Sequence, residues 1–312
     1  MFKRFIIIAL KILCCFIGHI PLSISLWIGR GLGRIGFYLD KKHREIALNN
    51  LKASFGDEKT SDEINIIAKK VFENLGMNVV EFCRLPYLKK ESLDKYIECE
   101  GFENFKMAYD KGRGVIFLTG HFGNWELMAI FYALKGYPVD IVVRDMDNPL
   151  IDEFVRWVRT KAGNRIISKG RSMRELLKIL SKGGVAGILL DQNVTWAEGV
   201  FVYFFNRLAC TNKGAALMAI SSGAPVVPTF IVRDGKRHRV IIDKEIDVID
   251  TGDRAKDQME NTAAFTRIIE DFARKYPEQW FWLHQRWKSR PENDPNRGTE
   301  RASLIENRLE EK

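Results

Sequence analysis

Apolar residues recur along the chain with two different periods, which predict both helices and strands. Within residues 40–84 the apolar positions Ile64, Ile67, Ala68, Val71, Phe72 and Leu75 are spaced like one face of a helix. Short apolar runs predict buried strands at 114–120, 138–143, 185–190, 225–232 and 238–243. Further helical patterns occupy 151–161, 171–182, 212–222 and 255–276. Strands that alternate with helices predict an α/β fold with a mixed sheet covered by helices.

The N-terminal segment has an apolar pattern of another kind. MFKRFIIIALKILCCFIGHIPLSISLWIG opens with two basic residues and then runs apolar, interrupted at Lys11, His19 and Pro21. A membrane span needs ~20 predominantly apolar residues, and no small-residue cleavage site of a signal peptide follows the segment. The pattern predicts a retained N-terminal membrane-anchoring helix, either a marginal span or a helix in the membrane interface. A buried helix of a soluble protein is the alternative.

Charge and composition narrow the possible partners and the domain organisation. Residues 1–44 hold eight Lys or Arg and one acid, which suits an anionic cytoplasmic leaflet. The net charge of +9 favours nucleic acid, anionic lipid headgroups or an acidic carrier protein. The chain is 46% hydrophobic and shows no dividing linker. We therefore expect an N-terminal anchor at 1–40, a single α/β domain at 41–290 and a charged, flexible tail at 291–312.

Two patterns that could indicate a bound group are weak. The five cysteines form no CxxC pair and share no spacing with histidines, so we expect reduced thiols in a cytosolic compartment. GLGRIG at 31–36 has the spacing of a dinucleotide-binding fingerprint, but no strand precedes it. Close helix packing at Gly29, Gly31, Gly33 and Gly36 is the preferred interpretation. No cofactor and no metal are predicted.

A histidine and a glutamate lie five residues apart in TGHFGNWELM, at 119–128. Such positions are about 140° apart on an ideal helix, so His121 and Glu126 can meet only across a turn. A strand that ends near Thr119 and a helix that starts near Asn124 as N-cap would provide this turn. Glu126 would then accept the Nδ1 proton of His121 and leave Nε2 free as a general base.

The rest of the motif predicts how such a base would be used. The chain has no GxSxG elbow and no cysteine in an activating setting, so an alcohol of the substrate is the expected nucleophile on a thioester. Backbone amides near Gly123 and Asn124, at the helix start, are the predicted donors to the oxyanion. A purely structural histidine is the alternative, and from spacing alone it is the commoner case.

Other polar and aromatic positions are candidates for binding. Residues 156–174 hold seven basic side chains and no acid, so this run could bind phosphates, dock an acidic carrier protein or form a solvated helix face. Arg144 ends a candidate strand, a common place for binding residues, although a surface salt bridge explains it equally well. Asp191 ends another candidate strand and could orient Arg159 or a sugar hydroxyl, or merely cap the loop that follows. QWFWLHQRWK at 279–288 fits either a membrane-interface belt or core packing, with His284 structural or interfacial.

Five blocks of the sequence occur in the order of a known family. They are HFGNWE at 121–126, VVRDMDNPLID at 142–152, GGVAGILLDQN at 183–193, GVFVYFFNRLACTNKGAALMA at 199–219 and PEQWFWLHQRWKSRP at 277–291. In these blocks the chain resembles the late acyltransferases of lipid A biosynthesis, the lauroyl and myristoyl transferase family, within the wider group that carries an HX4D/E motif. Together the blocks are far more specific than any single motif.

The resemblance implies a fold, an activity and a location. It implies a glycerol-phosphate-acyltransferase-like fold and an O-acyltransferase at the cytoplasmic face of the inner membrane. The enzyme would move a fatty acyl chain from acyl-carrier protein to a hydroxyl of a lipid A precursor, an anionic glycolipid. His121 matches the family's base, Glu126 its partner, and Arg159 and Asp191 match further polar positions that the family needs.

Three alternatives remain open at this point. The first is an acyltransferase of the same fold that acts on a glycerophospholipid or a phosphoinositide mannoside. The second is a thioesterase that uses water in place of the alcohol. The third is a basic nucleic-acid-binding protein, which only the +9 charge suggests. It is disfavoured because the sequence lacks RNP-type aromatics and a helix-turn-helix pattern, so no nucleic-acid partner is predicted.

Overall fold

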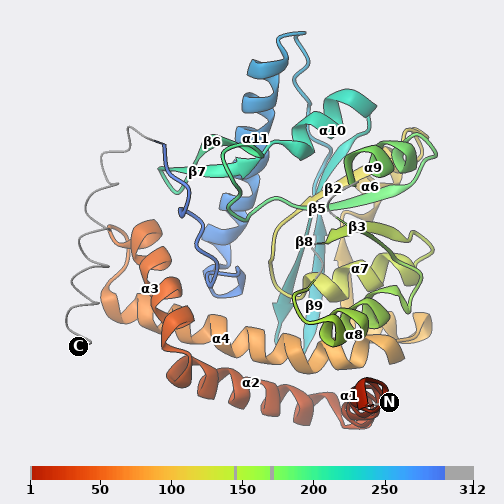
Figure 1. Ribbon diagram of the computed structural model, residues 1–312, viewed down its shortest axis with the longest axis vertical. Coiled ribbons are helices and arrows are strands. Elements are labelled where there is room, and N and C mark those ends of the chain that lie inside the picture. The colour runs from red at the N-terminus through yellow and green to blue at the C-terminus, as the bar shows by residue number, and fades with distance from the viewer. Residues whose placement is uncertain (1, 144–145, 169–171, 292–312) are drawn as a thin grey trace.

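A seven-stranded mixed sheet lies at the centre of the protein in a computed structural model that describes residues 2–143, 146–168 and 172–291 (Figure 1). The strand order is β1-β9-β8-β2-β5-β3-β4. The strands are β1 (Ile97–Glu100), β2 (Val115–Thr119), β3 (Val139–Val143), β4 (Arg165–Ser168), β5 (Val185–Leu189), β8 (Val226–Asp234) and β9 (Arg237–Ile242). Neighbours pair in parallel except for the antiparallel β8 and β9. The predicted mixed sheet is therefore confirmed.

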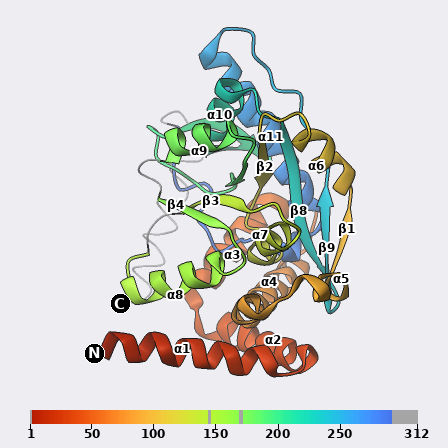
Figure 2. The same ribbon diagram turned by 90° about the vertical axis from the view of Figure 1, so that its right-hand side faces the viewer.

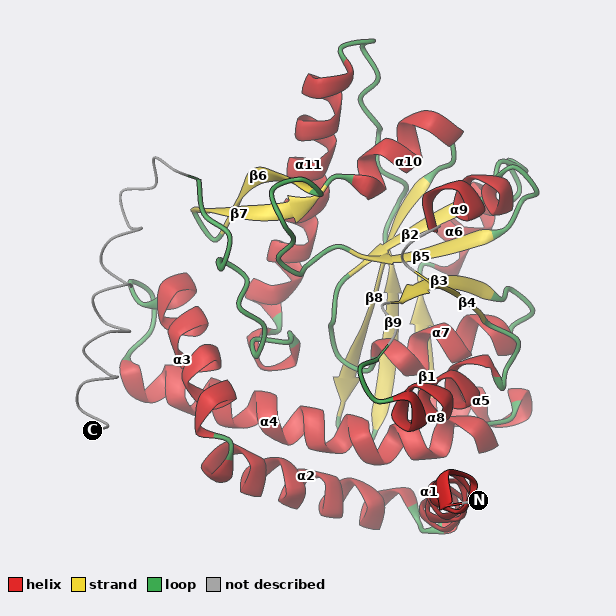
Figure 3. Ribbon diagram, viewed as in Figure 1, coloured by secondary structure: helices red, strands yellow, loops and turns green. Residues whose placement is uncertain are grey.

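Helices cover both faces of this sheet (Figure 3). One face packs against α6 (Phe102–Tyr109), α7 (Trp125–Leu134) and α8 (Pro149–Thr160), and the other against α9 (Ser172–Leu180), α10 (Gly214–Ser222) and α11 (Arg254–Lys275). Strand β2 shows how one run serves both faces. Val115 and Phe117 belong to the hydrophobic core on the side of α6, α7 and α8, and Ile116 and Leu118 belong to the core on the side of α9, α10 and α11. A strand buried on both sides has to be apolar throughout, which explains the continuous run in the sequence.

Most elements lie where the hydrophobic pattern predicts them, but the shortest strands do not follow it. The predicted strands correspond to β2, β3, β5, β8 and β9, and the predicted helices after residue 150 correspond to α8, α9, α10 and α11. Strands β1 and β4 were not predicted because each has four residues and partly exposed faces. The predicted tail at 291–312 lies outside the described residues except for Pro291.

A β-hairpin outside the main sheet was also not predicted. It consists of β6 (Gly199–Phe204) and β7 (Arg207–Asn212), which form a separate two-stranded sheet. Its two-residue turn, Phe205 and Asn206, has positive φ angles of 51° and 57°. Hairpin turns of this kind are usually marked by Asn-Gly or Asp-Gly, so Phe-Asn gave no signal.

The N-terminal helices pack beneath the sheet as a layered group. They are α1 (Phe2–His19), α2 (Leu22–Leu39), α3 (Lys41–Phe55) and α4 (Ser61–Arg84), followed by the short α5 (Leu93–Tyr96). Helix α2 lies directly on α4, and a Cβ atom added to Gly33 would be 2.1 Å from the carbonyl oxygen of Phe72. The predicted close packing is confirmed at Gly29 and Gly33, whereas Gly31 faces open space and Gly36 makes only an ordinary contact.

Helices α1 and α2 form one outer face of the molecule (Figure 2). Large apolar side chains project from this face into solvent, at helical spacing. They are Ile8, Ile12, Leu13 and Phe16 on α1, and Ile24, Trp27, Ile28, Leu32, Ile35, Tyr38 and Leu39 on α2. We call these residues the α1–α2 apolar face. In the part of the chain that the structure describes, no helix is both long and apolar enough to cross a membrane.

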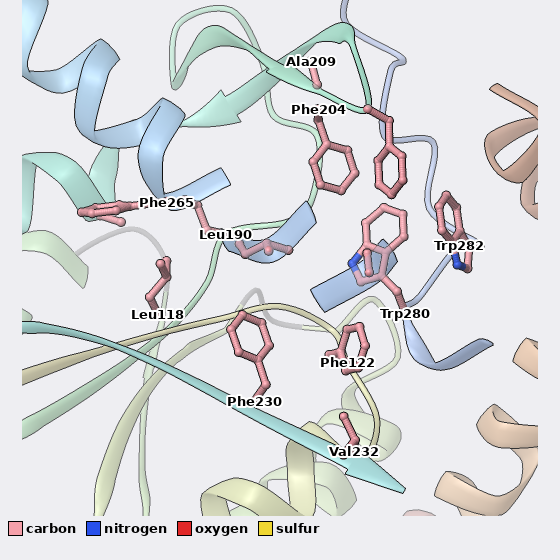
Figure 4. Close-up of a cluster of buried hydrophobic side chains, with 14 of the residues drawn as sticks. Leu118, Phe122, Leu190, Phe204, Ala209, Phe230, Val232, Phe265, Trp280 and Trp282 are labelled. Atoms are coloured by element: carbon pink, nitrogen blue, oxygen red, sulfur yellow. The ribbon is translucent and has the colours of Figure 1, made fainter. Parts of the chain in front are cut away.

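The aromatic block after α11 is part of the core (Figure 4). Trp280, Trp282 and Trp287 are only 1%, 0% and 6% exposed. The ring of Trp280 lies 5.2 Å from that of Phe204 on the hairpin, so this block joins the hairpin to the main core. The core-packing interpretation of the three tryptophans is confirmed, and the membrane-interface belt is wrong.

Candidate active site

His121 and Asp191 meet because two neighbouring parallel strands end at the same edge of the sheet. β2 pairs with β5 so that Thr119 lies beside Leu189. The pairing continues one step further, where the amide of Leu190 donates to the carbonyl of Thr119 at 3.0 Å. Each chain then turns away after its strand, and His121 and Asp191 occupy equivalent positions just beyond it.

Three N–H groups converge on the carboxylate of Asp191. His121 Nδ1 lies 2.8 Å from Oδ1, while the backbone N of His121 and the indole Nε1 of Trp280 each donate to Oδ2 at 2.8 Å. Burial alone would raise the pKa of this carboxyl, but the charge and hydrogen bonds of His121 and the indole bond of Trp280 hold it at about 2. An ionised carboxylate can only accept, so the network places the imidazole proton on Nδ1. Nε2 then carries the free lone pair of a base.

The predicted hydrogen bond between His121 and Glu126 is wrong. Glu126 instead accepts from Arg159, whose Nε lies 2.9 Å from Oε2 and whose Nη2 also donates. The predicted contact of Asp191 with Arg159 is wrong for the same reason. Glu126 lies in the first turn of α7 and faces α8, whereas Asp191 reaches the imidazole from the adjacent strand.

Glu126 nevertheless remains close to the imidazole through a tryptophan. The indole of Trp125 donates to Glu126 Oε1 at 3.2 Å, and its ring centroid lies 5.1 Å from that of His121. The side chain of His121 is 23% exposed and that of Arg159 is 24% exposed, so both are accessible from solvent. The imidazole and the Glu126–Arg159 pair thus belong to one continuous group of contacts.

The predicted turn is confirmed, but one of its proposed amide donors is already engaged. β2 ends at Thr119, and Asn124 is the N-cap of α7, with its Oδ1 accepting from Leu127 N at 3.0 Å. The amide of Gly123 donates to the carbonyl of Gln279 at 2.9 Å, so its predicted role at the oxyanion is wrong. Gly123 has φ +51°, and a Cβ there would lie 2.1 Å from the carbonyl oxygen of Ile231. The backbone amide of Asn124 remains a predicted donor.

A buried polar network behind the turn holds the start of α7 in place. Glu81 on α4 accepts from Asn124 Nδ2 at 2.8 Å, from Arg233 at 2.9 and 2.6 Å, and from His238 Nε2 at 2.9 Å. Burial opposes ionisation of Glu81, but the charges of His238 and Arg233 hold its pKa well below its usual range. Asn78, one turn earlier on α4, donates to the Gly123 carbonyl at 2.6 Å. No local sequence pattern predicts this network, because its members are far apart along the chain.

The C-terminal aromatic block supports the site from the other side. The amide of Phe281 donates to the His121 carbonyl at 3.0 Å, and His284 Nε2 accepts from the amide of Asn193 at 2.8 Å. Burial lowers the pKa of His284 to about 4, so this ring is neutral at neutral pH and can accept. Asn50 Nδ2 on α3 donates hydrogen bonds to the carbonyls of Trp282 and His284 and so holds the block in place. His284 therefore has a structural role beside the site.

The other basic residues of the predicted run are distributed among several partners. Arg156 donates to Asp152 on its own helix, and Arg165 donates to the buried carboxylate of Asp140 at 2.8 and 2.6 Å. Arg144, like Lys169 and Arg171 in the run, lies outside the described residues. Among the side chains that are described, no group of three or more His, Cys, Asp or Glu is placed to hold a metal ion.

Sequence comparisons with known proteins agree on one family. The chain is 28% identical to the lipid A biosynthesis lauroyltransferase of Escherichia coli K12, over 89% of this chain and 90% of that protein. It is 27% identical to the palmitoleoyltransferase (88% and 88% covered) and 25% identical to the myristoyltransferase (84% and 79%) of the same strain. A crystal structure of a 1-acyl-sn-glycerophosphate acyltransferase from Thermotoga maritima aligns with 82% of this chain and 99% of its own, at 14% identity and a TM-score of 0.39. Residues 1–289 match the family described as bacterial lipid A biosynthesis acyltransferase, and the chain therefore belongs to that family.

Proposed function

We propose that the protein transfers a fatty acyl chain from an acyl-carrier-protein thioester to a hydroxyl group of a lipid A precursor. One observation carries the mechanism: His121 binds a buried, ionised Asp191 through Nδ1 at 2.8 Å, which leaves Nε2 free to take a proton. Membership of the lipid A acyltransferase family supports the acceptor class, and the names of the relatives support a fatty acyl group.

The chemistry is a direct transfer in two steps. Nε2 of His121 removes the hydroxyl proton of the acceptor as its oxygen bonds to the thioester carbon, and the carbonyl electron pair moves to oxygen. When the tetrahedral intermediate collapses, the carbonyl re-forms, the C–S bond breaks and the imidazolium returns its proton to the departing thiolate. The products are an ester and a free thiol. Asp191 stabilises the imidazolium between these steps, a role that carboxylates have in Ser-His-Asp sites.

Glu126 has a different role in this proposal from the one its spacing suggested. It engages Nε and Nη2 of Arg159 and so fixes the plane of the guanidinium. Nη1 can then donate to a phosphate of the anionic acceptor, since a fixed guanidinium suits phosphate oxygens. The motif histidine would act on the hydroxyl, and the motif glutamate would position the residue that holds the acceptor.

We further propose that the α1–α2 apolar face attaches the protein to the cytoplasmic face of the inner membrane. Eleven large apolar side chains are exposed there, and Trp27, for example, is 76% exposed. Burying one such side chain is worth about 1.5–3 kcal/mol. Arg30 and Arg34 on the same helix are about half exposed, at 50% and 55%, and suit anionic headgroups. The amphipathic helices would lie in the interface, beside their lipid substrate.

The proposal is tested with labelled acyl-carrier protein and defined acceptor lipids. Wild-type protein should acylate the lipid A precursor, and His121→Ala should lose this activity while it keeps its fold. His43→Ala removes a surface histidine of α3 and is the matched control. Full activity of His121→Ala would refute the base. Release of free fatty acid without acceptor would indicate a thioesterase, acylation of a glycerophospholipid alone would move the substrate to another lipid class, and a preference for acyl-coenzyme A would change the donor.

A further inference from the structure

Gln192 lies in a loop that is fixed on both sides. On one side, Asp191 receives its three hydrogen bonds from His121 and Trp280. On the other side, the amide of Asn193 donates to His284, and the Asn193 side chain exchanges hydrogen bonds with Ser289 at 3.0 and 3.1 Å. The backbone of Gln192 is therefore held between two anchored residues, and its side chain projects from a rigid position.

The side chain of Gln192 faces the free nitrogen of the proposed base. Gln192 Nε2 lies 3.5 Å from His121 Nε2. Because the imidazole proton is on Nδ1, this contact is an amide donor directed at the Nε2 lone pair. At this length it is weak, and an acceptor hydroxyl can displace it. The attacking oxygen and the carbonyl that it attacks must then lie next to the carboxamide.

The reaction needs a donor at this place. Negative charge develops on the thioester oxygen during attack, and a preorganised donor is worth most where water is excluded. The Gly123 amide cannot supply it, because that amide donates to the Gln279 carbonyl. We infer that the side-chain amide of Gln192 donates a hydrogen bond to the oxyanion of the tetrahedral intermediate. This inference rests on the proposed function and makes Gln192 a catalytic residue of that reaction.

A role in merely holding the imidazole does not fit the contacts as well. The ring of His121 is already oriented by its 2.8 Å bond to Asp191. It also packs against the rings of Trp125 and Phe281, at centroid distances of 5.1 and 6.0 Å. A 3.5 Å contact adds little to this orientation, whereas a donor at that position is well placed for the reacting oxygen.

The test compares Gln192→Ala with Gln285→Ala, which removes an exposed glutamine of the C-terminal block. The turnover number of Gln192→Ala should fall about 10²–10³-fold, the usual loss of an oxyanion donor. The KM for either substrate, the pH profile and the melting temperature should stay at the wild-type values. Gln192→Glu keeps the shape but presents an acceptor, so its loss should be at least as large and should ease as the pH falls. Gln285→Ala should behave as wild type.

Three results would overturn the inference. The first is a turnover number of Gln192→Ala within about threefold of wild type, since one oxyanion donor is worth far more than this. The second is an effect of Gln192→Ala that is confined to KM. The third is a shifted pH profile, which would mean that Gln192 acts on the base instead. If His121→Ala abolishes acylation while Gln192→Ala does not reduce it, the inference fails and the proposed function stands. If wild-type protein acylates only another lipid, the proposed acceptor fails, and the same variants test Gln192 with that lipid.

Discussion

Replacing Asp191 with asparagine should move a single proton and thereby remove the base. Two N–H groups, from the His121 backbone and Trp280, converge on Oδ2 at 2.8 Å. The amide NH2 of an asparagine cannot face two donors, so its oxygen must occupy that position. The NH2 then faces His121 Nδ1, which has to accept. The imidazole proton is forced onto Nε2, where the acceptor hydroxyl would need a lone pair.

The magnitude follows from this change of tautomer. In a Ser-His-Asp triad the same exchange of Asp for Asn lowers the turnover number by about 10⁴. A factor of that size corresponds to about 5.5 kcal/mol of transition-state stabilisation, at 1.36 kcal/mol for each tenfold. We therefore expect Asp191→Asn to lose nearly as much activity as His121→Ala, although every ring of the site stays in place.

The assay pairs turnover with a direct observation of the proton. Single-turnover acylation gives the rate, and ¹⁵N NMR of labelled histidine reports which ring nitrogen is protonated. Asp140→Asn is the matched control, because Asp140 is also buried, at 1% exposure, and bound to an arginine, but lies on β3. It should destabilise the fold without changing the histidine tautomer. An Asp191→Asn protein that keeps more than a tenth of wild-type turnover, or that keeps the proton on Nδ1, would refute the reasoning.

Three further predictions follow from other contacts. Glu126→Ala should lower acylation about ten- to hundredfold, chiefly through the KM for the acceptor, because its partner Arg159 loses charged hydrogen bonds. Arg156→Gln, on α8 like Arg159, is the control. An unchanged KM in Glu126→Ala would contradict this role. Trp27→Glu should weaken sedimentation with anionic vesicles about tenfold, whereas Met107→Glu should not, because Met107 is also exposed, at 59%, but lies on α6; equal binding by both variants would exclude this face. The folded pKa of His284, about 4, lies below its ordinary 6.5, so only the unfolded chain takes up this proton as the pH falls from 7 to 5. The free energy of unfolding should therefore drop by about 2 kcal/mol from this residue, and in urea titrations His284→Gln should show a correspondingly shallower pH dependence; equal slopes would count against a buried neutral ring.

The sequence predicted elements well where they are long or buried on both sides. The helices from α8 onward and the strands β2, β3, β5, β8 and β9 follow directly from the apolar pattern. Strands β1 and β4 were missed because a strand of four residues with exposed positions carries too little hydrophobic pattern. The division into an anchor, one domain and a tail remains a prediction.

The candidate site residues remain predictions, whereas the predicted pairing between them was wrong. His121, Glu126, Arg159 and Asp191 were all candidates, yet spacing favoured Glu126 as the partner of the histidine because it is near in sequence. The observed partner is Asp191, which lies just after β5 and seventy residues away in sequence. Both residues follow the ends of predicted strands by the same short distance, so a parallel pairing of those strands would have revealed the contact. That pairing is a property of the whole sheet, which local pattern cannot supply.

Residues that follow the whole main sheet along the chain complete the site, which has a consequence for the order of biosynthesis. Trp280 supplies one of the three donors to Asp191, and Phe281 holds the His121 backbone. On a translating ribosome, helices α1 and α2 emerge before the sheet and before this aromatic block. Under the proposed membrane attachment they can therefore reach the bilayer while the site is still unmade. The imidazole stays without its full set of supports until Trp280 and Phe281 leave the exit tunnel, so a growing chain would reach its lipid surface before it completes its proposed catalytic site.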